Sequence, residues 1–115
     1  MTQTQLKSLK VINVPKDFSP FPAGRFVSDG PNSGERFRDA LLYPALQEAR
    51  NVQIVLDGSE GYGSSFLEEA FGGLVRIKGM NPEEILTRID FISKADPSLV
   101  TEITEYVRSA ATAKR

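Results

Sequence analysis

The chain has 115 residues, of which 40% are hydrophobic and 25% charged, and its formal net charge is −1, which indicates one ordinary globular domain with a single core. It contains no cysteine and no histidine, which excludes disulfides and thiolate chemistry and removes the most common general base and metal ligand. Near-neutral charge, and the absence of any apolar run close to ~20 residues, favour a soluble cytoplasmic protein that binds neither nucleic acid nor a membrane.

The two ends of the chain are polar. We expect residues 1–8 to form a flexible N-terminus, because nothing in them favours burial. A single domain then follows over residues 9–111. Residues 112–115 are expected to be a C-terminal tail.

The first third of the chain predicts two strands. The apolar residues 9–14 favour a strand, which Pro15 should end because proline cannot donate to a sheet. Prolines and glycine indicate a loop over residues 15–24. Residues 25–28 favour a second strand, and the composition of residues 29–34 is typical of a turn.

A helix is predicted after this turn. Ser33 is a suitable N-cap, since its hydroxyl can accept from a free backbone amide. Apolar residues then recur at four-residue spacing and mark a buried face: Phe37, Leu41, Ala45 and Ala49. Pro44 interrupts this pattern, so we expect the helix to be distorted near residues 40–42.

The central stretch predicts a strand, a glycine-rich turn and a second helix. Residues 52–57 are apolar and rich in β-branched side chains, and Gly58, Gly61 and Gly63 follow. Ser65 and Glu68 have the spacing of a capping box at the start of a helix. Gly72 and Gly73 lie inside this helix, where a close approach to the sheet or to the first helix would explain them.

The last third predicts one more strand and one more helix. Residues 81–84 resemble the start of a helical turn, and residues 85–91 alternate like a strand. Asp96 and Pro97 open a final helix by the same cap-and-proline pattern. The predicted fold is therefore an α/β domain with about four strands in a mixed sheet, three main helices and the order β-β-α-β-α-β-α.

Two motifs resemble a STAS-like bacterial domain family of unknown function, named for sulfate transporters and anti-sigma factor antagonists. The first is Gly61-Tyr-Gly-Ser-Ser-Phe-Leu-Glu-Glu-Ala-Phe-Gly-Gly-Leu-Val-Arg76. The second combines Gly24-Arg25 with residues 29–38. The resemblance extends over about residues 11–107 and implies a STAS-like fold.

The resemblance also implies a regulatory function. In well-studied STAS antagonists, a partner kinase phosphorylates a serine at the equivalent turn, which implies Ser65 here, with Ser64 as its neighbour. The domain would be a non-catalytic module that docks onto an ATPase- or kinase-like partner through the turn at residues 61–66. The residues expected to contact that partner are Glu60, Tyr62, Phe66 and Glu69. Helix capping alone is the competing explanation for the serines.

Two other functions are weighed against this one. A small-anion or nucleotide sensor could use the loop at residues 24–38, whose cations are Arg25, Arg36 and Arg38, although no complete phosphate-binding motif is present. A carboxylate- or metal-dependent enzyme could use Asp57, Glu60, Glu68 and Glu69. We expect no enzymatic activity, because the usual base is absent and the adjacent glutamates point about 100° apart on a helix. We expect no cofactor, and a monomer or weak dimer.

Overall fold

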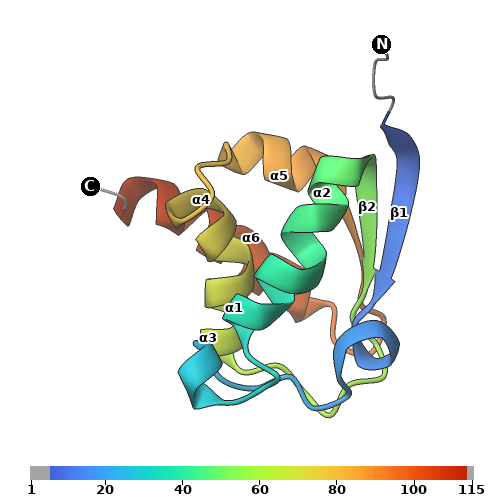
Figure 1. Ribbon diagram of the computed structural model, residues 1–115, viewed down its shortest axis with the longest axis vertical. Helices are drawn as coiled ribbons and strands as arrows, with labels where there is room; N and C mark the ends of the chain where they lie inside the picture. Colours follow the sequence, from blue (N-terminus) through green and yellow to red (C-terminus); the bar gives the residue numbers. More distant parts are fainter. Residues whose placement is uncertain (1–5, 114–115) are drawn as a thin grey trace.

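A computed structural model describes residues 6–113 of the chain. Its sheet has three parallel strands in the order β1-β2-β3, with β1 over Lys7–Asn13, β2 over Ala49–Val55 and β3 over Ile89–Ile92 (Figure 1). The mixed α/β class is confirmed. The prediction of a mixed sheet with about four strands is wrong.

The strand expected at residues 25–28 does not form. A short helical turn, η2, occupies Val27–Asp29 instead. The carboxylate of Asp29 accepts hydrogen bonds from the backbone amides of Arg25 at 3.1 Å and Phe26 at 2.8 Å. These amides are therefore satisfied locally and are not available to pair with a neighbouring strand.

The first long helical segment covers residues 34–48 without a break. It comprises α1 (Gly34–Phe37), η3 (Arg38–Leu42) and α2 (Tyr43–Glu48). Ser33 caps it as predicted, since its Oγ accepts from the amide of Arg36 at 3.1 Å.

The distortion predicted before Pro44 takes the form of a widened turn at η3. The amide of Tyr43 donates to the carbonyl of Arg38, five residues back rather than four. Such a widened turn accommodates the proline, which has no amide hydrogen to donate and whose ring crowds the preceding turn. The helix therefore continues past Pro44 to Glu48.

The second long helical segment covers residues 64–76. It comprises α3 (Ser64–Leu67), η4 (Glu68–Gly72), which is a second widened turn, and α4 (Gly73–Arg76). Together with the first segment it forms the two central helices of the domain (Figure 1).

The predicted strand at residues 85–91 is wrong over its first half. Helix α5 occupies Pro82–Arg88, and β3 begins only at Ile89. Asn81 explains the helix start, because its side-chain oxygen accepts from the amides of Glu83 and Glu84. Two helical turns fit where the alternation of apolar residues suggested a strand.

Helix α6 covers Ser98–Ala113, two residues beyond the expected end of the domain at residue 111. At the other end, β1 begins at Lys7, two residues before the expected start. Residues 1–5 of the expected flexible N-terminus and residues 114–115 of the expected tail lie outside the described residues. No described helix is both long and apolar enough to span a bilayer.

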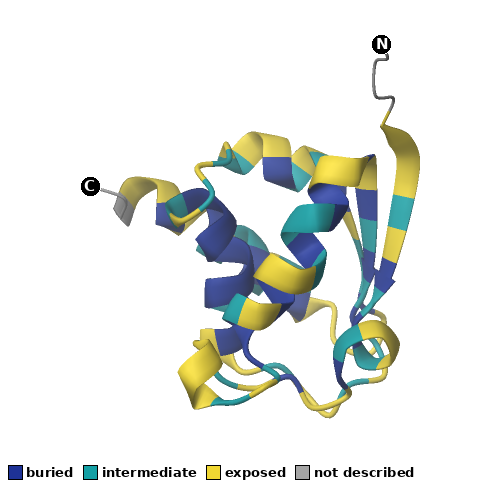
Figure 2. Ribbon diagram, viewed as in Figure 1, coloured by how far each residue is buried: buried dark blue, intermediate teal, exposed yellow. Residues whose placement is uncertain are grey.

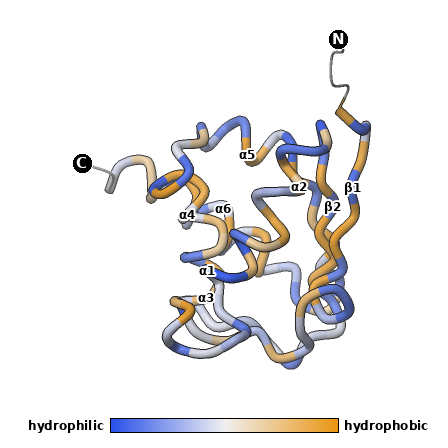
Figure 3. The backbone as a smooth tube through the Cα atoms, in the orientation of Figure 1, coloured by the Kyte–Doolittle hydropathy of each residue, from blue (hydrophilic) through white to orange (hydrophobic). Residues whose placement is uncertain are grey.

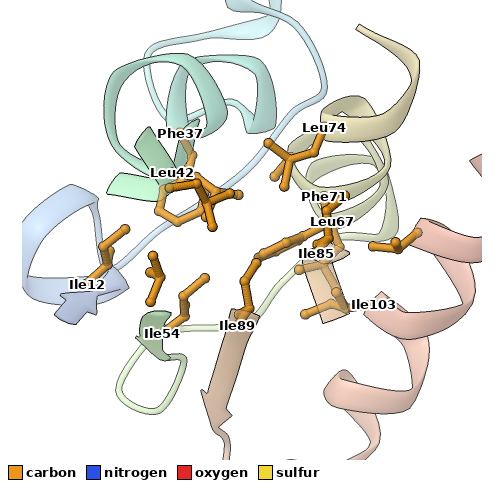
Figure 4. Close-up of a cluster of buried hydrophobic side chains, with 14 of the residues drawn as sticks. Ile12, Phe37, Leu42, Ile54, Leu67, Phe71, Leu74, Ile85, Ile89 and Ile103 are labelled. Carbon is orange, nitrogen blue, oxygen red and sulfur yellow. The ribbon is translucent and has the colours of Figure 1, made fainter. Parts of the chain in front are cut away.

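The helices lie to one side of the sheet, and the core lies between them (Figures 1 and 4). Ile12, Ile54 and Phe91 are in register across the three strands on the helix-facing side. Along the central helices, buried positions and hydrophobic positions largely coincide, whereas most of β1 is exposed (Figures 2 and 3). The largest fully buried side chains include Phe37, Phe66, Phe71, Leu42, Leu46, Leu67, Leu74, Ile85 and Ile103.

Candidate functional site

The loop that follows β2 forms the floor of the candidate site. Gly58 and Gly61 have φ values of 104° and 148°, which L-residues rarely adopt, so these two glycines are required by the turn as predicted. The carboxylate of Asp57 accepts from the amides of Lys94 and Ala95, each at 2.8 Å. These backbone hydrogen bonds, from Ala95 first and then Lys94, lower the pKa of Asp57. Asp57 therefore ties the β2 loop to the loop after β3.

A cavity of about 200 Å³ lies at the carboxyl ends of β2 and β3. Ligands of parallel sheets commonly bind at this end of the strands. Its wall combines hydroxyls, carboxylates and glycine backbone from three segments: Leu56, Asp57, Gly58, Ser59, Gly61, Tyr62, Ser93, Ala95, Asp96, Leu99 and Glu102.

Tyr62 turns inward rather than outward. Its hydroxyl donates to the carbonyl of Leu56 at 2.8 Å and accepts from Oγ of Ser59 at 2.9 Å. Its ring lies 6.0 Å from that of Phe66. Burial is the main cause of its raised pKa. Tyr62, which is expected to contact a partner, thus directs its hydroxyl into the domain, and the residue forms part of the cavity wall.

The second long helix begins at Ser64, and the two serines are exposed at its first positions. The N-cap residue is Gly63, and no side chain caps this helix start. The capping box predicted for Ser65 and Glu68 is therefore wrong. The box does not form because the helix begins one residue before Ser65, and because the Glu68 carboxylate pairs with Arg25 and Arg76 instead of the backbone. Glu60, in the preceding turn, is also exposed.

Glu68 and Glu69 anchor this helix to the rest of the domain. Glu68 pairs with Arg25 at 2.5 Å and also with Arg76. Glu69 pairs with Arg38 at 2.7 Å, Arg76 at 3.1 Å and Arg25 at 3.3 Å. Burial raises the pKa of Glu68, but the hydrogen bonds from Arg76 and Arg25 outweigh it and leave the pKa lowered.

Two residues predicted to contact a partner are buried in the domain. Phe66 is 1% exposed and packs in an aromatic cluster with Phe18 and Phe37. Glu69 is 4% exposed and is held by the arginines. Neither side chain is available at the surface, so both are removed from the predicted contact surface.

Gly73, the second glycine of the pair in this helix, makes room for Arg38. A Cβ added to Gly73 would collide with the Arg38 guanidinium. The predicted close approach between this helix and the first helix is therefore confirmed at Gly73.

Two of the three arginines predicted to bind an anion, Arg25 and Arg38, converge on an internal carboxylate, that of Glu69. Arg25 and Arg38 are engaged by the two glutamates. Arg36 donates to the carbonyl of Pro31 at 2.7 Å and lies 5.5 Å from the centre of the Phe18 ring. Two of the three guanidinium groups are therefore paired with internal carboxylates, while Arg36 is exposed and donates to a neutral carbonyl.

Three of the four carboxylates weighed as enzyme groups are already engaged by internal partners. Asp57 accepts backbone amides, and Glu68 and Glu69 face arginines, while Glu60 points to solvent. Among residues 6–113, no group of three potential ligands is close enough to hold a metal ion.

Helix α6 contributes residues that the sequence pattern did not reveal. The hydroxyl of Tyr106 donates to Glu102 at 2.6 Å, and this carboxylate is the main cause of the raised pKa of Tyr106. Ser64 lies near enough to Tyr106 to have an opposing effect on that pKa. No local signal could have found this proximity, because some forty residues separate the two helices in the chain.

Residues 33–99 match a family described as a STAS-like domain of unknown function (DUF4325). No curated protein and no solved structure matches the chain. The matched segment is more than half of the chain and contains the glycine-rich turn, both serines and the two central helices. The chain therefore belongs to this STAS-like family.

Proposed function

We propose that this member of the STAS-like family is a non-catalytic regulatory module, which binds a protein partner through the surface at residues 58–65. The observation that carries the proposal is the exposure of Ser64 and Ser65 at a helix start where neither is needed as a cap. Their hydroxyls are accessible to a partner, and the backbone beneath them is held rigidly by Glu68 and Glu69.

Phosphorylation of Ser65 or Ser64 by an ATPase- or kinase-like partner is the proposed switch. A phosphate at a helix start is compatible with folding, because the first amides of a helix are unpaired and the helix dipole favours negative charge there. The same phosphate would add about two negative charges to the docking surface. The module would thus remain folded while its surface changes.

The neighbouring charges make such a change effective. Glu60 is exposed in the adjacent turn, and Glu102 lies beside Tyr106, which lies near Ser64. A phosphate on either serine would increase the negative charge of this surface and oppose an acidic partner. A partner that binds the unphosphorylated surface would then be released.

The proposal that the module is non-catalytic rests on how its carboxylates are used. Asp57, Glu68 and Glu69 each have partners that fix the structure. A serine nucleophile at Ser64 or Ser65 would need an activating base, and the chain has no histidine. Tyr106 lies near Ser64, but its pKa is raised, so its hydroxyl stays protonated at neutral pH and does not supply that base.

The test measures how much of each partner copurifies with the wild-type protein and with variants that each add one negative charge. Wild-type protein, Ser64→Asp, Ser65→Asp and Ser109→Asp would be used to copurify partners from the native cells, with quantitative mass spectrometry as the readout. Ser109 is a matched control because it is an exposed serine of α6, far along the helix from its start. We expect loss of the same partner with Ser64→Asp or Ser65→Asp, and retention with Ser109→Asp.

The same preparation provides a second measurement. Fragment mass spectrometry of the wild-type protein should find a phosphate on Ser64 or Ser65. Equal recovery of every partner with all four proteins, together with unmodified serines across growth conditions, would contradict the proposal.

A further inference from the structure

Strand β1 is an edge of the sheet whose outer side is unpaired within the described residues. It pairs with β2 on one side only. The amide of Asn13 donates to the carboxylate of Asp17 at 2.8 Å, so this amide points away from the sheet. Because the backbone groups of alternate residues point to the same side of a strand, those of Lys7, Leu9 and Val11 also face the open edge.

Two apolar side chains of this strand are exposed. Leu9 is 50% exposed and Val11 is 47% exposed, and both lie on the face of the sheet turned away from the helices. A long, exposed, apolar edge strand is a template for pairing with another strand.

A groove of about 470 Å³ runs beside the same strand, on its helix-facing side. Leu41 and Pro44 of the first long helix form its apolar wall, opposite Ile12. At its other end, Lys10 and Glu48 form an exposed ion pair at 3.5 Å. The groove lies where the side chains of an added strand would point.

We propose that the occupant of this edge is β1 of a second copy of the chain, paired antiparallel about a two-fold axis at Leu9. Leu9 then lies opposite Leu9 of the partner copy, and Lys7 lies opposite Val11. Lys10 lies opposite Ser8, and Ile12 lies opposite Leu6. The two sheets become one sheet of six strands, with the Leu9 and Val11 side chains in contact across the axis.

Charge favours this register of strand pairing over the register shifted toward Lys10. A shift by one pair of backbone hydrogen bonds places Lys10 directly opposite Lys10, and like charges in directly opposed positions oppose pairing. It also requires the amide of Asn13, which is already bonded to Asp17. In the proposed register, Lys10 of each copy lies opposite Ser8 and faces the region of Glu48, so the glutamate is shared by two lysines.

The groove is complementary to the same register. Leu6, which is 41% exposed in the single chain, comes to lie opposite Ile12 and beside Leu41. Pairing through one strand and one groove is a small interface, which predicts a weak, concentration-dependent dimer.

Cysteine crosslinking tests the register, since the chain has no cysteine of its own. Cα atoms of a directly opposed, hydrogen-bonded antiparallel pair are about 5.5 Å apart, which suits a disulfide. We expect rapid formation of a disulfide dimer by Leu9→Cys under mild oxidation. Val11→Cys alone should not crosslink, because its two copies lie four residues, about 13 Å, apart along the strand. A mixture of Lys7→Cys and Val11→Cys should crosslink between the two variants.

Sedimentation of the wild-type chain over a concentration series tests the association itself. The average mass should rise with concentration. Leu9→Glu should remain monomeric, because it places two negative charges directly opposite each other on the two-fold axis. Lys10→Glu should also weaken the dimer, and the double variant Lys10→Glu/Glu48→Lys should restore it. Ile77→Glu is the matched control, since Ile77 is an exposed apolar residue of another surface.

Two results would overturn the proposal. One is a wild-type chain that stays monomeric at every concentration, which would leave the edge to a strand of a different protein. The other is Leu9→Cys crosslinking no faster than an Ile77→Cys control. Circular dichroism of each variant separates loss of pairing from loss of folding.

Discussion

Arg38 donates from Nη1 to Oε2 of Glu69 at 2.7 Å, and the side chains are only 3% and 5% exposed. The same guanidinium nitrogen also donates to the backbone carbonyl of Glu69 at 3.0 Å. Each residue lies in a widened helical turn, Arg38 in η3 and Glu69 in η4. This pair therefore joins the two central helices at the point where both depart from regular α geometry.

Removal of one member of this pair should strongly destabilise the domain. Glu69→Gln or Arg38→Met removes the closest partner of a buried charge, which costs up to about 3–5 kcal/mol of the free energy of unfolding. Replacement of both residues, as Arg38→Met/Glu69→Leu, should cost less than the sum of the single changes. Urea denaturation measures all three variants.

The pair formed by Glu83 and Arg108 supplies the control for that experiment. It is a single exposed ion pair at 3.3 Å, with side chains 70% and 60% exposed. Glu83→Gln should change the free energy of unfolding by no more than about 1 kcal/mol. Equal costs for Glu69→Gln and Glu83→Gln would contradict a structural role for the buried pair.

Gly34→Ala should destabilise the contact between the two central helices. A Cβ on Gly34 would overlap the backbone carbonyl of Phe66 and lie 3.1 Å from the amide of Ala70, and backbone atoms in a helix cannot move aside individually. We expect a loss of about 1–3 kcal/mol. Gly63→Ala is the matched change, because Gly63 has φ −71° and open space around it. A change of no more than about 0.5 kcal/mol is expected there by thermal or urea unfolding.

The two helix-start serines should respond differently to alanine. Ser33 is fully buried and caps its helix, so Ser33→Ala should cost about 1–2 kcal/mol. Ser65→Ala should change the free energy of unfolding by less than about 0.5 kcal/mol, because Ser65 is exposed and no side chain caps its helix. A cost near 1 kcal/mol for Ser65→Ala would show that it caps after all.

The domain should lose stability in acid. The folded-state pKa of Glu68 is lowered, because the hydrogen bonds from Arg76 and Arg25 outweigh the effect of burial, and that of Asp57 is lowered by two backbone amides. A carboxyl group with a lowered folded-state pKa stabilises the fold fully above its unfolded pKa, near 4, and loses that contribution as the pH falls through the folded value. Urea midpoints should therefore be constant above about pH 5 and decrease below it.

A variant separates this effect from general acid unfolding. Glu68→Gln removes one of the titrating groups, so its urea midpoint should depend less steeply on pH below about pH 5 than that of the wild type. Identical slopes would contradict the contribution assigned to Glu68.

The local chemistry of several helix starts and turns could be predicted from the sequence. Ser33 and Asn81 are N-caps, and Gly58 and Gly61 adopt positive φ values. Pro44 distorts its helix as expected. These features depend on backbone geometry within a few residues, where the propensity of one side chain is decisive.

The strand predictions were less successful for a physical reason. Residues 25–28 have the composition of a strand, but the carboxylate of Asp29 accepts hydrogen bonds from two of their backbone amides. Residues 85–91 alternate like a strand, but Asn81 starts a helix that extends to Arg88. A local hydrogen bond that competes with strand pairing is invisible to apolar periodicity.

The candidate site could be located from the sequence but not correctly assembled. The glycine-rich turn and the exposed serines were predicted, and so were Glu60 and Tyr62 in the same turn. The orientation of Tyr62 toward the Leu56 carbonyl depends on the path of the chain after β2. The proximity of Ser64 to Tyr106 depends on the packing of α6 beside the second long helix.

By itself, the sequence determined the α/β class, the glycine turn after the central strand, the caps at Ser33 and Asn81 and the family resemblance, because each depends on residues close together in the chain. Only the tertiary structure decided that Phe66 and Glu69 are buried, that Arg25 and Arg38 neutralise internal glutamates rather than an external anion, and that β1 is an edge strand of the sheet formed by residues 6–113. Burial and charge pairing depend on segments far apart in the chain. Arg38 and Glu69 are 31 positions apart and meet only because Gly34 and Gly73 let two helices approach closely.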